Sequence, residues 1–288
     1  MKIPRCSAFA LIASLLALPA VAAVDFHDHL GIQVWSLRDT AKTDLPGSLD
    51  LIKSYGLTEI EANGAPPIPI EQYAKLIKDR GLVSIGAHFG YEMLVKDLDT
   101  AVKNAKILGL KYAATAWIPH DGKIGLTAAQ AHQAAIDFNR AGEAFRAAGI
   151  QFAWHCHGFE FVPLAEAGGK TAFEIIVAET KPENLALEMD VFWVFHAGQD
   201  PVTLLKKYPG RWQLMHVKDI RKGAVTGLST GGAAPIDNVA VGTGQINWPA
   251  VLKTAQDNGT KYFFIEDETP TPLVCIPDSL KYLRALKL

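Results

Sequence analysis

Short apolar runs alternate with longer amphipathic segments along most of the chain. The short runs are rich in β-branched and aromatic residues, which is typical of buried strands. Eight such runs follow one another, at 31–35, 57–62, 82–88, 110–117, 150–156, 185–190, 211–217 and 261–266. No convincing sequence repeat accompanies them. The pattern therefore predicts eight strands separated by segments long enough to hold helices.

The segments between the runs carry the signals of helices. The predicted helices span 46–55, 69–80, 94–108, 128–148, 171–180, 201–208, 248–258 and 278–286. Glycine stands directly after four of them, at 81, 109, 149 and 259, where it commonly ends a helix. Strand–helix units of roughly thirty residues favour parallel strands joined by helical crossovers.

The predicted fold is a single (β/α)8 TIM barrel over residues 24–288. A chain of this length matches the usual size of such a barrel, about 250 residues. A doubly wound open sheet is the alternative, but GIQVWSLRD (31–39) offers no G-x-G-x-x-G turn. The longest loop, 221–245, is rich in small residues and follows the seventh strand, so it is a candidate lid.

The first 23 residues have a different pattern, with Lys2 and Arg5 before a short apolar run that ends in small residues. This is the pattern of a secretory signal peptide, and an uncleaved anchor is the less favoured alternative. We expect an exported, periplasmic protein that is free of the membrane after cleavage. Only Cys156 and Cys275 remain beyond this segment, so one bridge is possible but a disulfide scaffold is not.

The charges are balanced, with 28 basic and 30 acidic residues and a formal net charge of −2. No cluster of Lys and Arg is long enough to follow a phosphate backbone, which argues against nucleic acid as a partner. The 49% of hydrophobic residues is ample for a large core. The chain gives no indication for or against a homo-oligomer.

Ionisable residues gather at the predicted C-terminal ends of the strands, where TIM barrels carry their chemistry. They are Glu61, His88, His120, His155, His157, Glu160, Asp190, His196, His216, Lys218, Asp219, Glu266, Asp267 and Glu268. Taken singly, a histidine here can be structural, Asp190 a helix cap and 266–268 a solvated acidic turn. Together, the carboxylates would repel one another unless a cation lay among them. We therefore expect one divalent metal ion, and histidine with carboxylates suits Mn, Zn, Mg or Co.

The stretch FAWHCHGFEF (152–161) runs from the fifth predicted strand into the following loop and carries two histidines and a glutamate within an aromatic, apolar run. Side chains alternate between the two faces of a strand, so His155 and His157 share the inward face. Cys156 then faces the helices, as a buried residue rather than a nucleophile. Glu160 lies beyond the strand and can curl back over the rim.

The stretch MDVFWVFHAGQDPVTLLKKYPGRWQLMHVKD (189–219) resembles the sugar phosphate isomerase/epimerase family, whose members have the xylose isomerase-like TIM barrel. GIQVWSLRD, AHFGYEML, WHCHGFEF and VGTGQINWPAVL are similar to that family too. The resemblance implies one divalent metal ion held by residues from strands five to eight, namely Glu160, Asp190, His216 and Glu266. The His-x-His-x-x-Glu pattern departs from the commoner family motif, and His155 is the alternative to Glu160.

The resemblance also implies a sugar isomerase or epimerase that removes a proton from carbon next to a carbonyl. The expected catalytic residues are Glu160, Glu266, His157 and Lys218, although Lys218 can instead form an ion pair with Asp219. The expected sugar-binding residues are His88, His155, Trp35, Trp193 and His196. Export favours a non-phosphorylated sugar or keto-sugar.

Three alternatives remain open from the sequence. A 3-keto-glycoside lyase or hydrolase would use the same metal site, because it starts with the same proton removal. A non-catalytic sugar-binding protein would keep the barrel fold without the catalytic activity. A nuclease would need three metal ions and a basic track for DNA, which the balanced charge disfavours.

Overall fold

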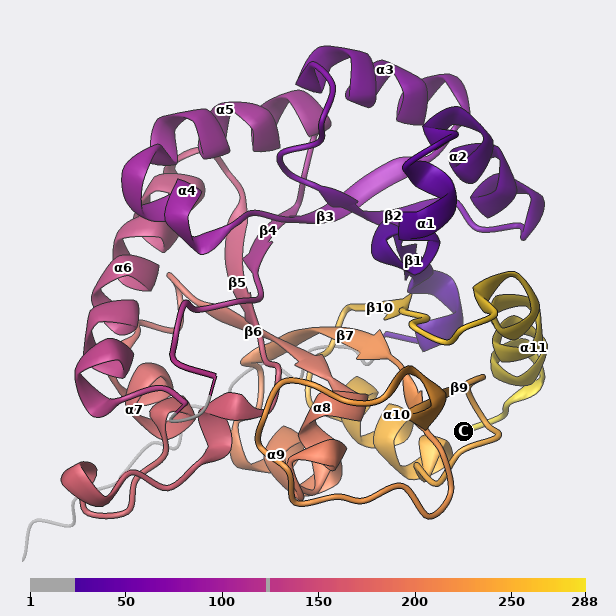
Figure 1. Cartoon of the computed structure of the whole chain (residues 1–288). Coiled ribbons are helices and arrows are strands. Elements are labelled where there is room, and N and C mark those ends of the chain that lie inside the picture. The colour runs from indigo at the N-terminus through magenta and orange to yellow at the C-terminus, as the bar shows by residue number, and fades with distance from the viewer. Residues whose placement is uncertain (1–23, 123–124) are drawn as a thin grey trace, which may run out of the picture.

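The computed structural model describes residues 24–122 and 125–288. The predicted signal peptide, 1–23, lies outside these residues. Eight parallel strands close into a barrel in the order β1-β10-β7-β6-β5-β4-β3-β2. Figure 1 shows the helices as an outer ring around these strands. The predicted TIM barrel is confirmed.

The barrel strands coincide with the eight apolar runs of the sequence. They are β1 (Leu30–Gln33), β2 (Glu59–Asn63), β3 (Val83–His88), β4 (Tyr112–Thr115), β5 (Gln151–His155), β6 (Ala186–Asp190), β7 (Trp212–Val217) and β10 (Tyr262–Ile265). Every neighbouring pair in the barrel is parallel. The runs were recognisable because each strand of a TIM barrel is buried against the helices on one face and the barrel interior on the other.

The helices lie close to the predicted positions, except that the short helix at 38–41 was not predicted and three further differences occur. They are α1 (Arg38–Ala41), α2 (Leu45–Ser54), α3 (Ile70–Asp79), α4 (Tyr91–Lys96), α5 (Leu98–Leu108), α6 (Ala128–Ala147), α7 (Ala172–Glu179), α8 (Val191–His196), α9 (Pro201–Lys207), α10 (Trp248–Asp257) and α11 (Pro272–Ala285). The prediction 94–108 is in fact two helices, α4 and α5, which meet at Asp97. Helix α11 begins six residues before the predicted start at 278, and the short α8 was not predicted. Within the described ranges, no helix has both the length and the apolar character needed to cross a membrane.

The barrel interior is apolar at one end and polar at the other. Eight inward-facing residues form a buried apolar floor: Ile85, Tyr112, Ala114, Ala153, Ala186, Leu214, Tyr262 and Phe264. Two positions further along the strands, the same faces carry His155, Glu188, His216 and Glu266. Since residues two positions apart on a strand point to the same face, both layers consist of inward-facing side chains. The polar layer lies at the C-terminal ends of the strands, as predicted.

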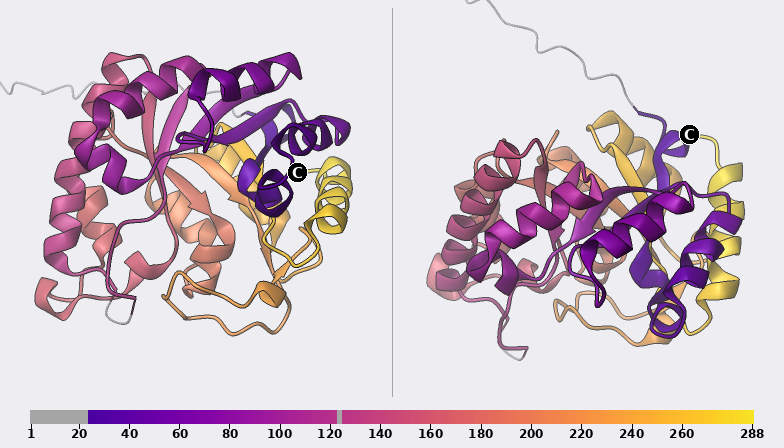
Figure 2. Two further views of the ribbon diagram at one scale, coloured as in Figure 1. Left: turned by 45° about the horizontal axis from the view of Figure 1, so that its top comes forward. Right: turned by 90° about the horizontal axis from the view of Figure 1, so that it is seen from above.

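The loop 221–245 is anchored next to the barrel by a small antiparallel pair, β8 (Asp219–Ile220) with β9 (Asn238–Val239). Both views in Figure 2 show this orange segment outside the barrel strands. The carboxylate of Asp219 accepts hydrogen bonds from the backbone N–H of Gly242 at 2.9 Å and of Gly244 at 3.1 Å. It also accepts one from the indole N–H of Trp248 at 2.9 Å. The alternative ion pair between Lys218 and Asp219 is therefore wrong, because neighbouring residues on this segment face opposite ways.

Replacing Asp219 by alanine is expected to lower the free energy of unfolding by about 3 kcal/mol, because several buried donors lose their acceptor at once. Equilibrium urea unfolding measures this change. Asp237→Ala is the matched control, since Asp237 pairs with Arg221 on the same loop in a more exposed position. Equal stability of Asp219→Ala and the control would show that the anchor contributes little.

Candidate metal centre and substrate cavity

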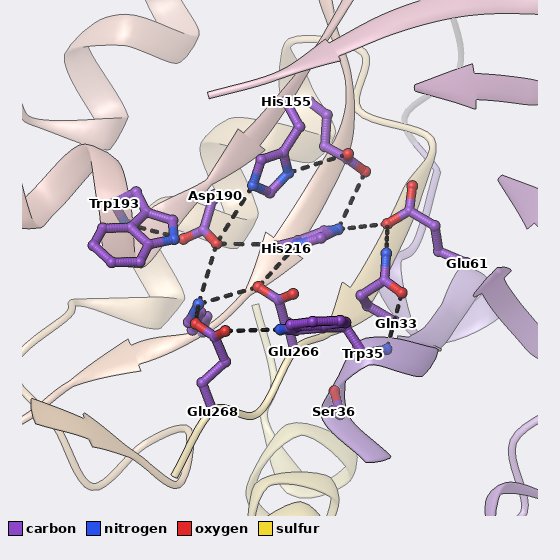
Figure 3. Close-up of polar contacts among 12 residues, drawn as sticks. Gln33, Trp35, Ser36, Glu61, His155, Asp190, Trp193, His216, Glu266 and Glu268 are labelled. Atoms are coloured by element: carbon purple, nitrogen blue, oxygen red, sulfur yellow. Dashed lines mark hydrogen bonds and ion pairs between the residues drawn. The ribbon is translucent and has the colours of Figure 1, made fainter. Parts of the chain in front are cut away.

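Four side chains from neighbouring strands converge in the polar layer of the barrel. They are His155 from β5, Asp190 from β6, His216 from β7 and Glu266, which follows β10 (Figure 3). Asp190 Oδ2 lies 3.8 Å from His155 Nε2 and 3.9 Å from His216 Nδ1. Glu266 Oε2 lies 3.3 Å from the same His216 Nδ1. The structure thus brings together three of the four predicted ligands, with His155 beside them.

Asp190 serves two purposes at the end of β6. Its Oδ1 accepts a hydrogen bond from the backbone N–H of Trp193 at 2.9 Å and caps α8. Its Oδ2 is buried and has no hydrogen-bond partner. Burial raises the pKa of Asp190 to about 7, against the attraction of Lys218. A buried carboxylate oxygen without a partner is costly, and a cation at that point removes the cost.

The donor set fits a divalent metal ion. Two imidazole nitrogens and two carboxylate oxygens are a combination that Zn, Mn and Co accept. Asp190, His216 and Glu266 each offer one donor atom, and these atoms lie within 4.8 Å of one another. These three residues, with His155 Nε2 at 3.8 Å from Asp190 Oδ2, supply donors of the types that such an ion binds.

Lys218 adds a permanent positive charge beside this set. Its Nζ lies 3.1 Å from Glu266 Oε2 and 3.7 Å from Asp190 Oδ2, and it also contacts the Glu268 carboxylate. Burial opposes the charged ammonium, but attraction to Glu266 and Asp190 outweighs it and raises the pKa of Lys218. Lys218 therefore balances part of the negative charge of these three carboxylates.

A second group of polar side chains lies deeper in the barrel. His88 Nε2 is 2.8 Å from Glu188 Oε2 and 3.2 Å from Glu61 Oε2. Burial disfavours the imidazolium, but attraction to Glu61 and the hydrogen bond with Glu188 raise the pKa of His88 to about 10. Glu188 has no role in the sequence prediction. Its position two residues before Asp190, on the same inward face, is the signal that identifies it.

Glu160 lies apart from the candidate metal centre. Its side chain is fully buried, and Oε1 accepts a hydrogen bond from the backbone N–H of His157 at 2.9 Å. Burial raises the pKa of Glu160 to about 7. Among the described residues, Glu160 belongs to neither group of converging ligand atoms and does not line the cavity described below. The carboxylate holds the turn after β5 rather than reaching over the rim.

A cavity of about 660 Å³ opens above the centre. His155, His157 and Glu266 line its inner part. Apolar residues form much of the remaining wall, among them Val34, Trp35, Ala41, Leu45, Pro66, Pro67, Trp117 and Trp193, and polar residues, including Gln33, Arg38, Lys42, Asn63 and Glu268, also line it. The ring faces of Trp35 and Trp117 are accessible, with 53% and 45% of each residue exposed. Gly231 of the loop 221–245 also reaches the cavity wall.

Four of the five predicted sugar-binding residues line this cavity, namely His88, His155, Trp35 and Trp193. His196 does not, because it ends α8 and stacks on Phe192 instead. Cys156 is buried and Cys275 is partly buried, and both are free, so the possible bridge between them is not formed.

Comparisons with known proteins agree with the fold. A family model described as the xylose isomerase-like TIM barrel matches residues 49–286. Inosose dehydratase of Mesomycoplasma hyopneumoniae is 30% identical over 161 residues, which is 51% of this chain and 52% of that protein. The chain thus spans about half the length of the curated relatives that it matches.

Two solved structures share the architecture. A sugar phosphate isomerase/epimerase from Parabacteroides distasonis superposes with a TM-score of 0.74 at 23% identity, over 90% of this chain and 98% of that one. The IOLI protein with a bound zinc atom superposes with a TM-score of 0.67 at 15% identity, over 89% and 95% of the two chains. Because the family model covers most of the sequence and the barrel matches it, the chain belongs to the xylose isomerase-like TIM barrel family.

Proposed function

We propose that this chain is a divalent-metal-dependent enzyme that isomerises or epimerises a non-phosphorylated sugar or keto-sugar. It would do so by removing a proton from carbon next to a carbonyl group. The observation that carries the proposal is that ring nitrogens of His155 and His216 lie within 4 Å of the unpartnered Oδ2 of Asp190, with Glu266 beside His216, at the inner end of an open cavity.

His155, Asp190, His216 and Glu266 are the proposed ligands. A bound divalent ion would supply fixed positive charge to the substrate oxygens where negative charge develops. His155 takes the place that the sequence prediction gave to Glu160, because its Nε2 faces the centre whereas the Glu160 carboxylate faces the turn backbone.

Three further side chains have geometry suited to the substrate. His157 lines the cavity with a buried Nδ1 that has no hydrogen-bond partner, so we propose it as a proton acceptor or donor. Trp35 offers an exposed indole for the C–H surface of a sugar, and the buried Trp193 forms part of the cavity wall. Lys218 stays behind Glu266 and would steady charge at the centre rather than contact the substrate directly.

The positively charged side chains of the cavity wall support a substrate without a phosphate group. Among its described lining residues, the cationic side chains are Arg38 and Lys42. Arg38 donates to the backbone carbonyls of Trp35 and Asp267, and Lys42 pairs with Asp39. Both are therefore already engaged. The predicted export of the chain favours the same class of substrate.

Elimination from a keto-glycoside is the second candidate. The apolar part of the cavity, with Leu45, Pro66 and Pro67, extends beyond the charged inner part and suits a substituent on the sugar. The relatives named inosose dehydratase also point to elimination. Both reactions begin with the same proton removal, so the same side chains serve either.

The proposed ligand from β5 is tested by two variants. His155→Ala is expected to lower metal affinity by about 1,000-fold, or about 4 kcal/mol, because a ligand is lost. Glu160→Gln is expected to bind one ion per chain as the wild type does, because Glu160 Oε1 accepts from the His157 backbone and its Oε2, although buried without a hydrogen-bond partner, lies outside both groups of converging ligand atoms. Competition with a chelator measures both affinities. If metal affinity falls in Glu160→Gln alone, then Glu160 rather than His155 is the metal ligand.

The reaction is tested by incubating metal-loaded protein with keto-sugars and oxidised glycosides in deuterated water. Incorporation of solvent deuterium next to the carbonyl, abolished by a chelator and restored by a divalent metal, is the expected result. No exchange with any of them would favour the non-catalytic sugar-binding barrel. The number of bound metal ions per chain tests the nuclease alternative, which requires three ions instead of one.

A further inference from the structure

Two carboxylates lie beneath the proposed ligands. Glu61 contacts His216, whereas Glu188 contacts His155 and also lies 3.4 Å from His216 Nε2. Glu61 Oε2 lies 2.6 Å from His216 Nε2, while His216 Nδ1 faces Glu266 at 3.3 Å. Glu188 Oε2 lies 3.2 Å from His155 Nδ1, while His155 Nε2 faces Asp190. In both rings, one nitrogen meets a deep carboxylate and the other faces the candidate metal centre (Figure 3).

This arrangement determines which nitrogen of each ring can bind a metal. A neutral imidazole carries one N–H, and a metal binds only the nitrogen without it. An ionised carboxylate only accepts hydrogen bonds, so it selects the N–H. Glu61 therefore places the N–H of His216 on Nε2 and leaves Nδ1 free. Glu188 places the N–H of His155 on Nδ1 and leaves Nε2 free.

The fold also fixes the position of Glu61. Its Oε2 accepts a hydrogen bond from Gln33 Nε2 at 2.7 Å. The orientation of the Gln33 amide is set in turn, because its oxygen accepts from the backbone N–H of Trp35 at 3.1 Å. On the other side, a Cβ at Gly86 would lie only 3.0 Å from Glu61 Oε1, so the absent side chain gives the carboxylate its space.

We propose that Glu61 and Glu188 are positioning residues that select the metal-binding nitrogens of His216 and His155. This inference rests on the proposed metal centre. Carboxylates that orient ligand histidines generally strengthen metal binding, and losing one costs about 10- to 100-fold in affinity. Neither carboxylate needs to touch the substrate in this role.

A second metal ion is the competing explanation. His88, His155, Glu188 and His216 each offer a donor atom within 4.8 Å of the others, and the buried Glu188 Oε1, 3.4 Å from His216 Nε2, has no hydrogen-bond partner. Within this group, Glu188 Oε2 lies 2.8 Å from His88 Nε2 and 3.2 Å from His155 Nδ1. These are hydrogen-bond lengths, and they favour the positioning role over a shared ion.

The experiment compares zinc binding by the wild type, Glu61→Gln and Glu188→Gln. Glu59→Gln is the matched control, because Glu59 also lies on β2 and contacts a histidine, His29, outside the site. Zinc affinity is measured by competition with a chelator. We expect one ion per chain in all four proteins, with affinity about 10- to 100-fold weaker in the two test variants and unchanged in the control.

Nitrogen NMR of the zinc-loaded protein with ¹⁵N-labelled histidine gives a second measure. In the wild type, we expect N–H on His216 Nε2 and on His155 Nδ1. In Glu61→Gln, the His216 N–H signal should move upfield, since its acceptor has lost its charge. The wild-type spectrum tests the inference even if a variant does not fold, because zinc on His216 Nε2 would overturn it.

The remaining outcomes separate the two proposals. Wild-type zinc affinity in both test variants would refute the positioning role while leaving the metal centre intact. Two ions per wild-type chain, with one lost in Glu188→Gln, would replace the positioning role by a second metal site. Absence of zinc from the wild type would refute the metal centre itself.

Discussion

Replacing Asp190 by alanine is expected to lower metal affinity by about 1,000-fold, or about 4 kcal/mol, and to abolish deuterium exchange into the substrate. The reason is that Asp190 Oδ2 lies within 4 Å of His155, His216 and Lys218 and has no hydrogen-bond partner of its own. Its removal therefore takes away the atom on which the centre converges. Metal content after gel filtration and exchange followed by NMR measure the two effects.

Asp257→Ala is the control for this prediction, because Asp257 lies exposed on α10 and pairs only with Lys253 among the described contacts. It should keep full metal content and exchange. Asp190 also caps α8, so thermal unfolding must show that Asp190→Ala remains folded. A folded variant with undiminished metal content would contradict the proposed centre.

Replacing Lys218 by methionine is expected to destabilise the metal-free protein by about 3 to 5 kcal/mol. Lys218 balances the carboxylates of Asp190, Glu266 and Glu268, and methionine leaves them without that cation. Methionine fills the space of the buried lysine stem, but it also removes the ammonium that lies over the Trp193 ring. Urea unfolding in the presence of a chelator measures the loss.

A divalent metal should recover most of that stability and should bind the variant at least as tightly as the wild type. Both follow because a competing positive charge has been removed from beside the centre. Lys111→Met is the matched control, since Lys111 also lies against a barrel residue, Tyr262. Weaker metal binding by Lys218→Met would show that the ammonium supports the centre in another way.

The sequence predicts the barrel well for a physical reason. Strands buried on both faces must be apolar and short, and glycine after the helices marks where each unit ends. The break between α4 and α5 at Asp97 was not predicted, because the helical pattern of apolar residues continues across it. The early start of α11 at Pro272 follows from proline at the first turn, which helices tolerate.

The site is predictable where residues lie on strands and less so where they lie on loops. Alternation along β6 places Glu188 with Asp190, whereas Lys218 and Asp219 follow the end of β7 and contact different groups. Glu160 follows the strand by five residues, through Gly158 with φ of 93°, so no period fixes its direction. Strand alternation does not fix the direction of His196 either, because this residue ends the short helix α8 and does not line the cavity.

Crystals of the zinc-loaded protein, with an anomalous difference map, test the central claim most directly. We predict one peak per chain, about 2.0 to 2.2 Å from His155 Nε2, Asp190 Oδ2, His216 Nδ1 and Glu266 Oε2. A peak coordinated by Glu160, three peaks in the barrel, or no peak among these four residues would contradict it.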